Sequence, residues 1–360
     1  MKKGMQSQNT RINNFLLWML IASIVWISVA LLYSISGIDW LENTDSTQYF
    51  GVVNDLRAFE PAIQPLYPAI VRGLTELFPQ IEPAMIGQFV SFVSYIVAVA
   101  FMHKLFQLLN VKKTVEMTLI WAMFPFVGVT MSVYPRANAL LLLFTVLCFW
   151  SYVKNNTLIF IITVSLLPLI HKSSLFFLIF LIPIAFFEKK IKWWMVLLTG
   201  FPTLLYIFLG ILEHDTFLRY FQPHKGITPV TSLLLGDGLL GTIILGIRGS
   251  IPDMIQGMIV ISYFIFAIYL LLSKIWKGQL FILSAILPVI ILGLVLPARE
   301  IWSLINYTSF FVISISLLDW HDENYLGKKK FKWVYIFLIS CAYFSQFAYA
   351  LYDLRFYGLI

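Results

Sequence analysis

A polar stretch between residues 39 and 73 holds side chains that could carry out acid–base chemistry. It contains five carboxylates together with arginines, tyrosines and prolines. A carboxylate that is partly removed from water has a raised pKa, which brings it closer to the range of a general base. Asp45 is the first candidate for such a base and Asp55 the second. Tyr49 follows Asp45 by four residues and shares a face with it if this stretch is helical. The structural alternative is that Asp45 is a helix N-cap or a solvated loop residue.

The composition determines the class of protein that must position these residues. Hydrophobic residues make up 60% of the 360-residue chain, charged residues make up 12%, and the mean hydropathy is +0.85. A soluble domain could not bury that much apolar surface. Runs of about 20 apolar residues are long enough to cross the hydrocarbon core of a bilayer as helices. We therefore expect an all-α polytopic membrane bundle, and we read the net charge of +7 as orientation bias rather than affinity for nucleic acid.

The apolar runs predict eleven transmembrane helices in one domain that spans residues 1–360. They lie near residues 15–37, 84–102, 114–133, 137–153, 157–170, 174–187, 193–212, 254–273, 279–297, 301–318 and 333–352. The fifth and sixth are short for a full crossing, so they could instead form a broken, partly re-entrant unit.

Two long connections, 38–83 and 213–253, are expected on the outer side. Residues 63–78 within the first are expected to form an amphipathic interfacial helix. Whether residues 233–247 within the second cross the membrane stays open.

The distribution of basic residues between the two sides of the membrane agrees with a cytoplasmic N-terminus. In this topology the cytoplasmic connections carry fifteen lysines and one arginine, as the positive-inside rule expects, whereas the outer ones carry seven arginines and two lysines. Arginine binds phosphate and carboxylate through a planar fork, so the outer pattern favours a site for an anionic group. The candidate residues for binding that anionic group are Arg136, Lys172 and Arg299, with His171 assisting. The alternatives are ion pairs with outer carboxylates, snorkelling side chains and a short solvated turn at 171–174.

A family resemblance joins these features. Asp45-Ser46-Thr47-Gln48-Tyr49, followed by Pro65-Leu66-Tyr67-Pro68, resembles the first outer loop of GT-C membrane glycosyltransferases, with the GPI mannosyltransferase II type the most similar. Thr44 stands where that family often has Trp. Beyond residues 15–75 the resemblance is architectural. The segment around Arg136 and His171-Lys172-Ser173-Ser174 is also similar to EpsG/Wzy-like exopolysaccharide proteins.

The GT-C resemblance implies a transferase that uses a polyprenyl-phosphate sugar as donor and a lipid-linked or cell-surface glycan as acceptor. It implies Asp45 as the base, inversion at the sugar carbon, and Tyr49 and Tyr67 packing the sugar or shaping the loop. The EpsG/Wzy resemblance implies instead a polymerase that takes pyrophosphate-linked oligosaccharides. A lipid-linked sugar transporter is a third possibility, but it predicts an inverted repeat that the sequence does not show.

No cofactor, metal or nucleic-acid partner is expected. The chain contains no phosphate-cradling GxxxxGK[ST], no HExxH and no GxSxG. The group Glu213-His214-Asp215 and the pair His224-Lys225 have no spacing typical of a compact metal site. Cys148 and Cys341 both lie in apolar runs and predict neither a disulfide nor a thiolate centre. The abundance of Lys, Ile and Phe suggests a bacterial plasma membrane, with the bilayer itself as a partner.

Overall fold

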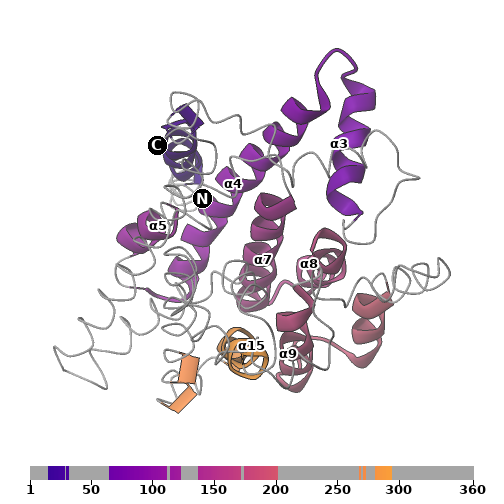
Figure 1. Cartoon of the computed structure of the whole chain (residues 1–360). Helices are drawn as coiled ribbons and strands as arrows, with labels where there is room; N and C mark the ends of the chain where they lie inside the picture. Colours follow the sequence, from indigo (N-terminus) through magenta and orange to yellow (C-terminus); the bar gives the residue numbers. More distant parts are fainter. Residues whose placement is uncertain are drawn as a thin grey trace, which may run out of the picture. The chain divides into compact units, whose positions relative to one another are not determined.

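The computed structural model describes residues 15–28, 30–31, 65–111, 114–122, 137–171, 174–201, 267–268, 271–272 and 280–293 (Figure 1). In these ranges every regular element is a helix, which confirms the all-α class there. The described residues fall into two compact units, one up to Thr163 and the other from Val164 onward. The eleven crossings and the single domain stay predictions.

Two helices of the first unit are long and apolar enough to cross a membrane. They are α4 (Pro83–Leu108) and α7 (Ala137–Lys154), which pack against each other (Figure 1). At 1.5 Å per residue they measure about 39 and 27 Å, against about 30 Å for the hydrocarbon core. Four small residues of α4, spaced at helical intervals, are buried: Gly87, Ser91, Ser94 and Ala98. Small residues let apolar helices approach closely, which is how helices associate in lipid.

The helix Phe15–Ser28 lies antiparallel to α4. Phe15 meets Phe101 with ring centroids 5.5 Å apart, and Trp26 meets Phe92 at 4.9 Å, so the order along the two helices is reversed. The opposite face of the Phe15–Ser28 helix is apolar and exposed, with Leu16, Leu17, Leu20 and Ile24 each more than half exposed. An apolar face of this length is costly in water and suits contact with lipid.

A buried polar network joins α4 to α5 (Thr114–Ala122). Thr118 Oγ1 donates to the carbonyl of Thr114 at 2.6 Å, so it can only accept from His103 Nδ1, at 3.0 Å. His103 Nε2 then accepts from Gln107 Nε2 at 2.9 Å. The network therefore assigns a neutral imidazole with its proton on Nδ1. Trp18 covers the imidazole, with ring centroids 4.5 Å apart.

Three helices end in the same way without glycine. Asn110, Asn155 and Lys189 have φ values of 55°, 57° and 58°, in the left-handed region. The residue after each donates to a carbonyl five positions earlier, as in a Schellman motif: Val111 to Phe106, Asn156 to Ser151 and Lys190 to Ala185. Asparagine tolerates this conformation well, whereas lysine is strained in it.

The predicted short pair of helices is confirmed at 157–170 and 174–187, as α8 (Thr157–Ile170) and α9 (Ser174–Phe187). Each measures about 21 Å, less than the thickness of the hydrocarbon core. The side chain of Asn156 caps α8 by accepting from the Ile159 N–H at 3.3 Å. In the second unit α9 packs against η4 (Leu280–Ile282) and α15 (Leu283–Gly293), and residues 193–201 are helical.

The strained cap at Lys189 gives a first test. Replacing Lys189 by Gly should raise stability by about 1 kcal/mol, because glycine adopts positive φ without a steric penalty. Lys192→Gly removes the same charge three residues later and should bring no gain. Thermal unfolding of the purified protein in detergent measures both variants. Equal behaviour of the two would contradict the strain at Lys189.

Candidate functional site

Two of the candidate site residues lie in the described part of the chain. These are Tyr67 and His171; the others lie outside it, namely Asp45, Tyr49, Asp55, Arg136, Lys172 and Arg299. Tyr67 belongs to the first unit and His171 to the second. Each is therefore considered with its own surroundings.

The Pro65-Leu66-Tyr67-Pro68 motif forms the beginning of helix α3 (Leu66–Leu77). Pro65 occupies the N-cap, and its carbonyl accepts from the Ala69 N–H at 3.1 Å. Pro68 costs little in the first turn, because the N–H groups there have no helical partner in any case. The helix predicted over 63–78 is confirmed, but it begins later, after the first proline. Its predicted position on a membrane interface stays a prediction.

Tyr67 fastens this helix to α4. Its side chain is fully buried, and its hydroxyl donates to the carbonyl of Gly87 at 3.0 Å. Figure 1 shows α3 beside the N-terminal part of α4, in agreement with their contacts. Burial and this bond hold α3 against α4, and both roles expected of Tyr67, packing the sugar or shaping the loop, stay predictions.

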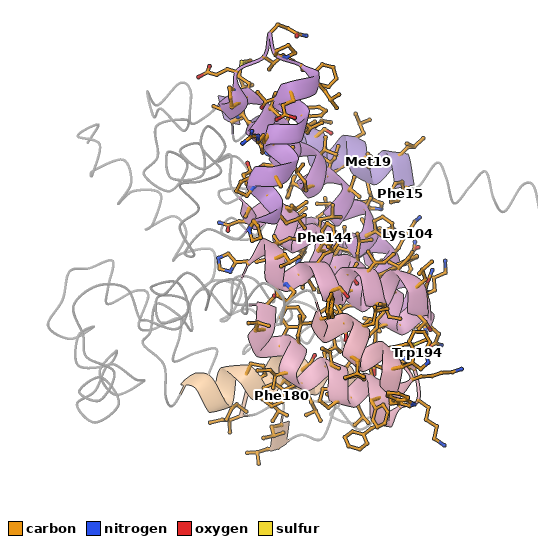
Figure 2. The ribbon with its side chains drawn as sticks, turned by 90° about the vertical axis from the view of Figure 1, so that its right-hand side faces the viewer. Phe15, Met19, Lys104, Phe144, Phe180 and Trp194 are labelled. Carbon is orange, nitrogen blue, oxygen red and sulfur yellow. The ribbon has the colours of Figure 1, made fainter. Side chains whose placement is uncertain are left out.

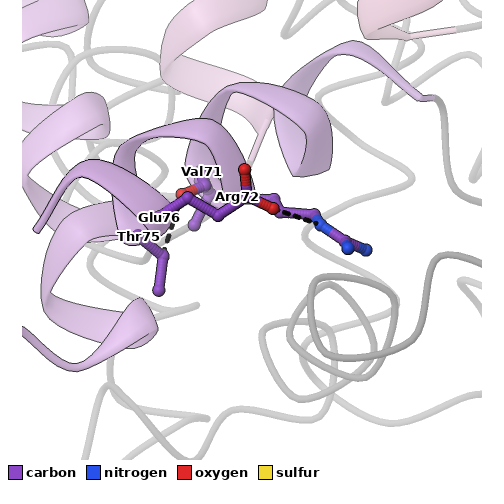
Figure 3. Close-up of polar contacts among 4 residues, drawn as sticks. All are labelled: Val71, Arg72, Thr75 and Glu76. Carbon is purple, nitrogen blue, oxygen red and sulfur yellow. Dashed lines mark hydrogen bonds and ion pairs between the residues drawn. The ribbon is translucent and has the colours of Figure 1, made fainter. Parts of the chain in front are cut away.

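Arg72 lies on the outward face of α3 and already has an anionic partner. Its Nε donates to Glu76 Oε1 at 3.0 Å, while Thr75 Oγ1 donates to the Val71 carbonyl at 2.9 Å (Figure 3). An exposed pair of this i,i+4 type contributes only a few tenths of a kcal/mol. It nevertheless balances the guanidinium charge, which makes Arg72 a weaker candidate for binding a phosphate.

Large apolar side chains are exposed along the turn from α3 into α4. They are Leu77, Phe78, Ile81, Met85 and Phe89. They extend from the end of α3 to the second turn of α4, next to the residue that anchors Tyr67. Exposed apolar side chains of this size suit contact with a membrane interface.

Gln88 was not singled out from the sequence. Its Nε2 atom is buried and finds no hydrogen-bond partner among the described residues. It directly follows Gly87, so it lies at the end of α4 to which α3 is fastened. A buried amide donor without a partner costs free energy unless something else accepts from it. The available signal was a glutamine in an otherwise apolar span, which makes Gln88 a further candidate to meet a polar substrate group.

His171 connects α8 to α9. The backbone N–H of His171 donates to the carbonyl of Leu167 at 3.0 Å, and the backbone carbonyl of His171 accepts from the Ser174 N–H at 3.1 Å. The side chain is half-buried at this junction. A titratable ring at the end of an apolar helix is a functional candidate, and phosphate binding by His171 stays a prediction.

Nothing in the described ranges gathers three His, Cys, Asp or Glu side chains into a possible metal site. Cys148 is buried and is not part of a disulfide. Comparison with protein-family models, with curated proteins and with solved structures finds no match to this chain.

The Tyr67 anchor gives a second test. Tyr67→Phe removes the buried hydroxyl that donates to the Gly87 carbonyl and should lower stability by about 1 kcal/mol. Tyr95→Phe is the matched control, since Tyr95 is also fully buried and its hydroxyl donates to the Ala122 carbonyl at 2.6 Å. Both variants should lose stability in thermal unfolding. Trypsin cleavage after Arg72, within α3, should speed up only in Tyr67→Phe, and equal cleavage of the two variants would contradict the anchor.

Proposed function

We propose that this protein is a membrane glycosyltransferase of the GT-C type. It moves a sugar from a polyprenyl-phosphate donor to a lipid-linked or cell-surface glycan at the outer face of a plasma membrane. The proposal includes the eleven crossings with a cytoplasmic N-terminus and an outer loop over 38–83.

The motif Asp45…Tyr49…Pro65-Leu66-Tyr67-Pro68 carries the proposal. The structure describes its second half, where the two prolines and Tyr67 begin α3 and fasten it to an apolar helix long enough to cross a bilayer. The exposed apolar edge around Phe78 and Met85 supports an interfacial position for this helix. A loop held in this way could keep a carboxylate near lipid, where a lipid-linked donor presents its phosphate.

The chemistry needs one base and several cations. Asp45 takes the proton from the acceptor hydroxyl as the oxygen of that hydroxyl attacks the anomeric carbon of the donor sugar. The bond from that carbon to the donor phosphate breaks on the opposite side, so the configuration inverts. The leaving phosphate carries away the bonding electrons, and cations stabilise it. Arg136, Lys172 and Arg299 are the proposed cations, His171 assists, and Gln88 is an additional donor for either substrate.

A polysaccharide polymerase of the EpsG/Wzy type is the second candidate. The segment from Arg136 to Ser174 favours it, because an arginine that leads a helix, a gap and then His171-Lys172-Ser173-Ser174 resemble that pattern. Its donor carries a pyrophosphate and an oligosaccharide. The two candidates therefore differ in the donor that they accept.

Transfer assays with purified protein in nanodiscs test the proposal. Wild type should use short-chain polyprenyl-phosphate monosaccharides, and Asp45→Asn should lower the rate by about 10²–10⁴-fold through loss of the base. Glu76→Gln is the matched control, because it neutralises another carboxylate near the motif and should leave the rate within about twofold.

The outcomes separate the candidates. Extension of pyrophosphate-linked oligosaccharides, with no use of monosaccharide monophosphates, would establish the polymerase. Full activity of a folded Asp45→Asn protein would exclude Asp45 as the base and direct the same test to Asp55.

A further inference from the structure

Two lysines and three aromatic rings form a cluster at one end of the first unit. The rings form a ladder, since Phe15 meets Phe101 edge-on at 5.5 Å and Phe101 meets Trp150 edge-on at 5.0 Å. The Lys104 ammonium lies 4.2 Å from the centre of the Phe15 ring. Both residues are labelled in Figure 2. The Lys154 ammonium lies 4.6 Å from the centre of the Trp150 ring. We call these five residues the lysine–aromatic cluster.

The positive charge of the cluster is not neutralised within the described part of the chain. Neither lysine forms an ion pair with a described carboxylate, and the two charges repel each other. A cation–π contact holds an ammonium in place but supplies no hydrogen-bond acceptor for its three N–H groups. The exposed ends of α4 and α7 offer only partial negative charge. Two fixed, neighbouring ammonium groups are therefore left to attract an anion from outside.

Lys190 shows the contrasting arrangement. Its Nζ lies 3.8 Å from Glu188 Oε2. Burial lowers the pKa of Lys190, and the Glu188 carboxylate acts in the opposite direction. This lysine thus has a counter-ion of its own.

The position of the cluster indicates which anion it meets. Lys104 lies in the last turns of α4 and Lys154 ends α7, and these are the two helices long enough to cross a membrane. Phe15 begins an antiparallel helix whose outer face is apolar. Gly87, which anchors Tyr67, lies 17 residues before Lys104, about 26 Å away along α4. The cluster therefore lies at the opposite end of the span from the proposed transfer site, where aromatic and basic residues meet lipid headgroups.

We propose that the lysine–aromatic cluster binds the phosphate of an anionic phospholipid headgroup on the cytoplasmic side of the membrane. The two ammonium groups donate to the phosphate oxygens, and the exposed apolar side chains of the neighbouring helix contact the acyl chains. This site is separate from the proposed donor site, and its binding can be measured without any transfer activity.

Native mass spectrometry of the full-length protein in detergent, titrated with phosphatidylglycerol, tests the proposal. Lys104→Gln/Lys154→Gln should bind phosphatidylglycerol about 30-fold more weakly, which corresponds to about 1 kcal/mol for each lysine. Lys190→Gln is the control for loss of one positive charge and should change binding by less than about twofold. Lys104→Arg/Lys154→Arg keeps both charges and should retain most of the affinity.

Further measurements on wild type keep the test decisive if the double variant folds poorly. Binding of phosphatidylglycerol should weaken as salt rises and should exceed that of phosphatidylcholine. Indifference to salt or to headgroup charge would overturn the proposal, as would an equal loss in Lys190→Gln. Displacement of the lipid by an equimolar amount of inorganic phosphate would assign the cluster to a free anion and overturn the lipid assignment.

Discussion

Close packing against α4 is the interaction on which the described part of the first unit depends. Helix α4 contacts α3, α5 and α7, and its aromatic residues meet those of the Phe15–Ser28 helix. In lipid the hydrophobic effect does not drive helices together. Their association there depends on van der Waals contact between small residues and on a few hydrogen bonds. The buried Gly87, Ser91, Ser94 and Ala98 allow that contact. The hydroxyls of Tyr67 and Tyr95 and the His103 network supply the polar bonds.

The same packing brings different kinds of residues together at the two ends of the unit. The C-termini of α4 and α7 lie together, as the electrostatic effect of Lys154 on Lys104 and the ladder of rings that joins both helices to Phe15 show. The two candidate spans therefore run in the same direction, and the predicted span at 114–133 would return the chain between them. Lysines gather at this end, whereas the proline–tyrosine motif and the α3 helix lie at the other. The proposed transfer site and the proposed lipid site follow from this separation.

Sequence reasoning located the helices better than it located their ends and contacts. Hydropathy predicted 157–170 and 174–187 correctly, since turn residues interrupt the apolar runs there. It ended the second span at residue 102, where charge begins, yet α4 continues to Leu108 because its end is determined by the cap around Asn110. Tyr67 bonds to Gly87, 20 residues away along the chain, and His103 bonds to Thr118, 15 residues away, and no local pattern identifies these two partners. The lysines were read only as a topology signal, because their ring contacts depend on three packed helices. Within the predicted site, Asp45 and most of its proposed partners lie outside the described residues and stay predictions from the sequence motif.

The proposed topology places the two ends of this unit on opposite sides of the membrane, and cysteine accessibility in intact cells measures this sidedness. Glu76 and Glu116 are exposed glutamates placed by the proposed topology on opposite sides, so the same substitution to cysteine can be made at both. In a chain whose Cys148 and Cys341 are replaced by serine, a membrane-impermeant maleimide should label Glu76→Cys in intact cells. It should label Glu116→Cys only after the membrane is permeabilised. Labelling of both positions from the same side would contradict the two-ended arrangement.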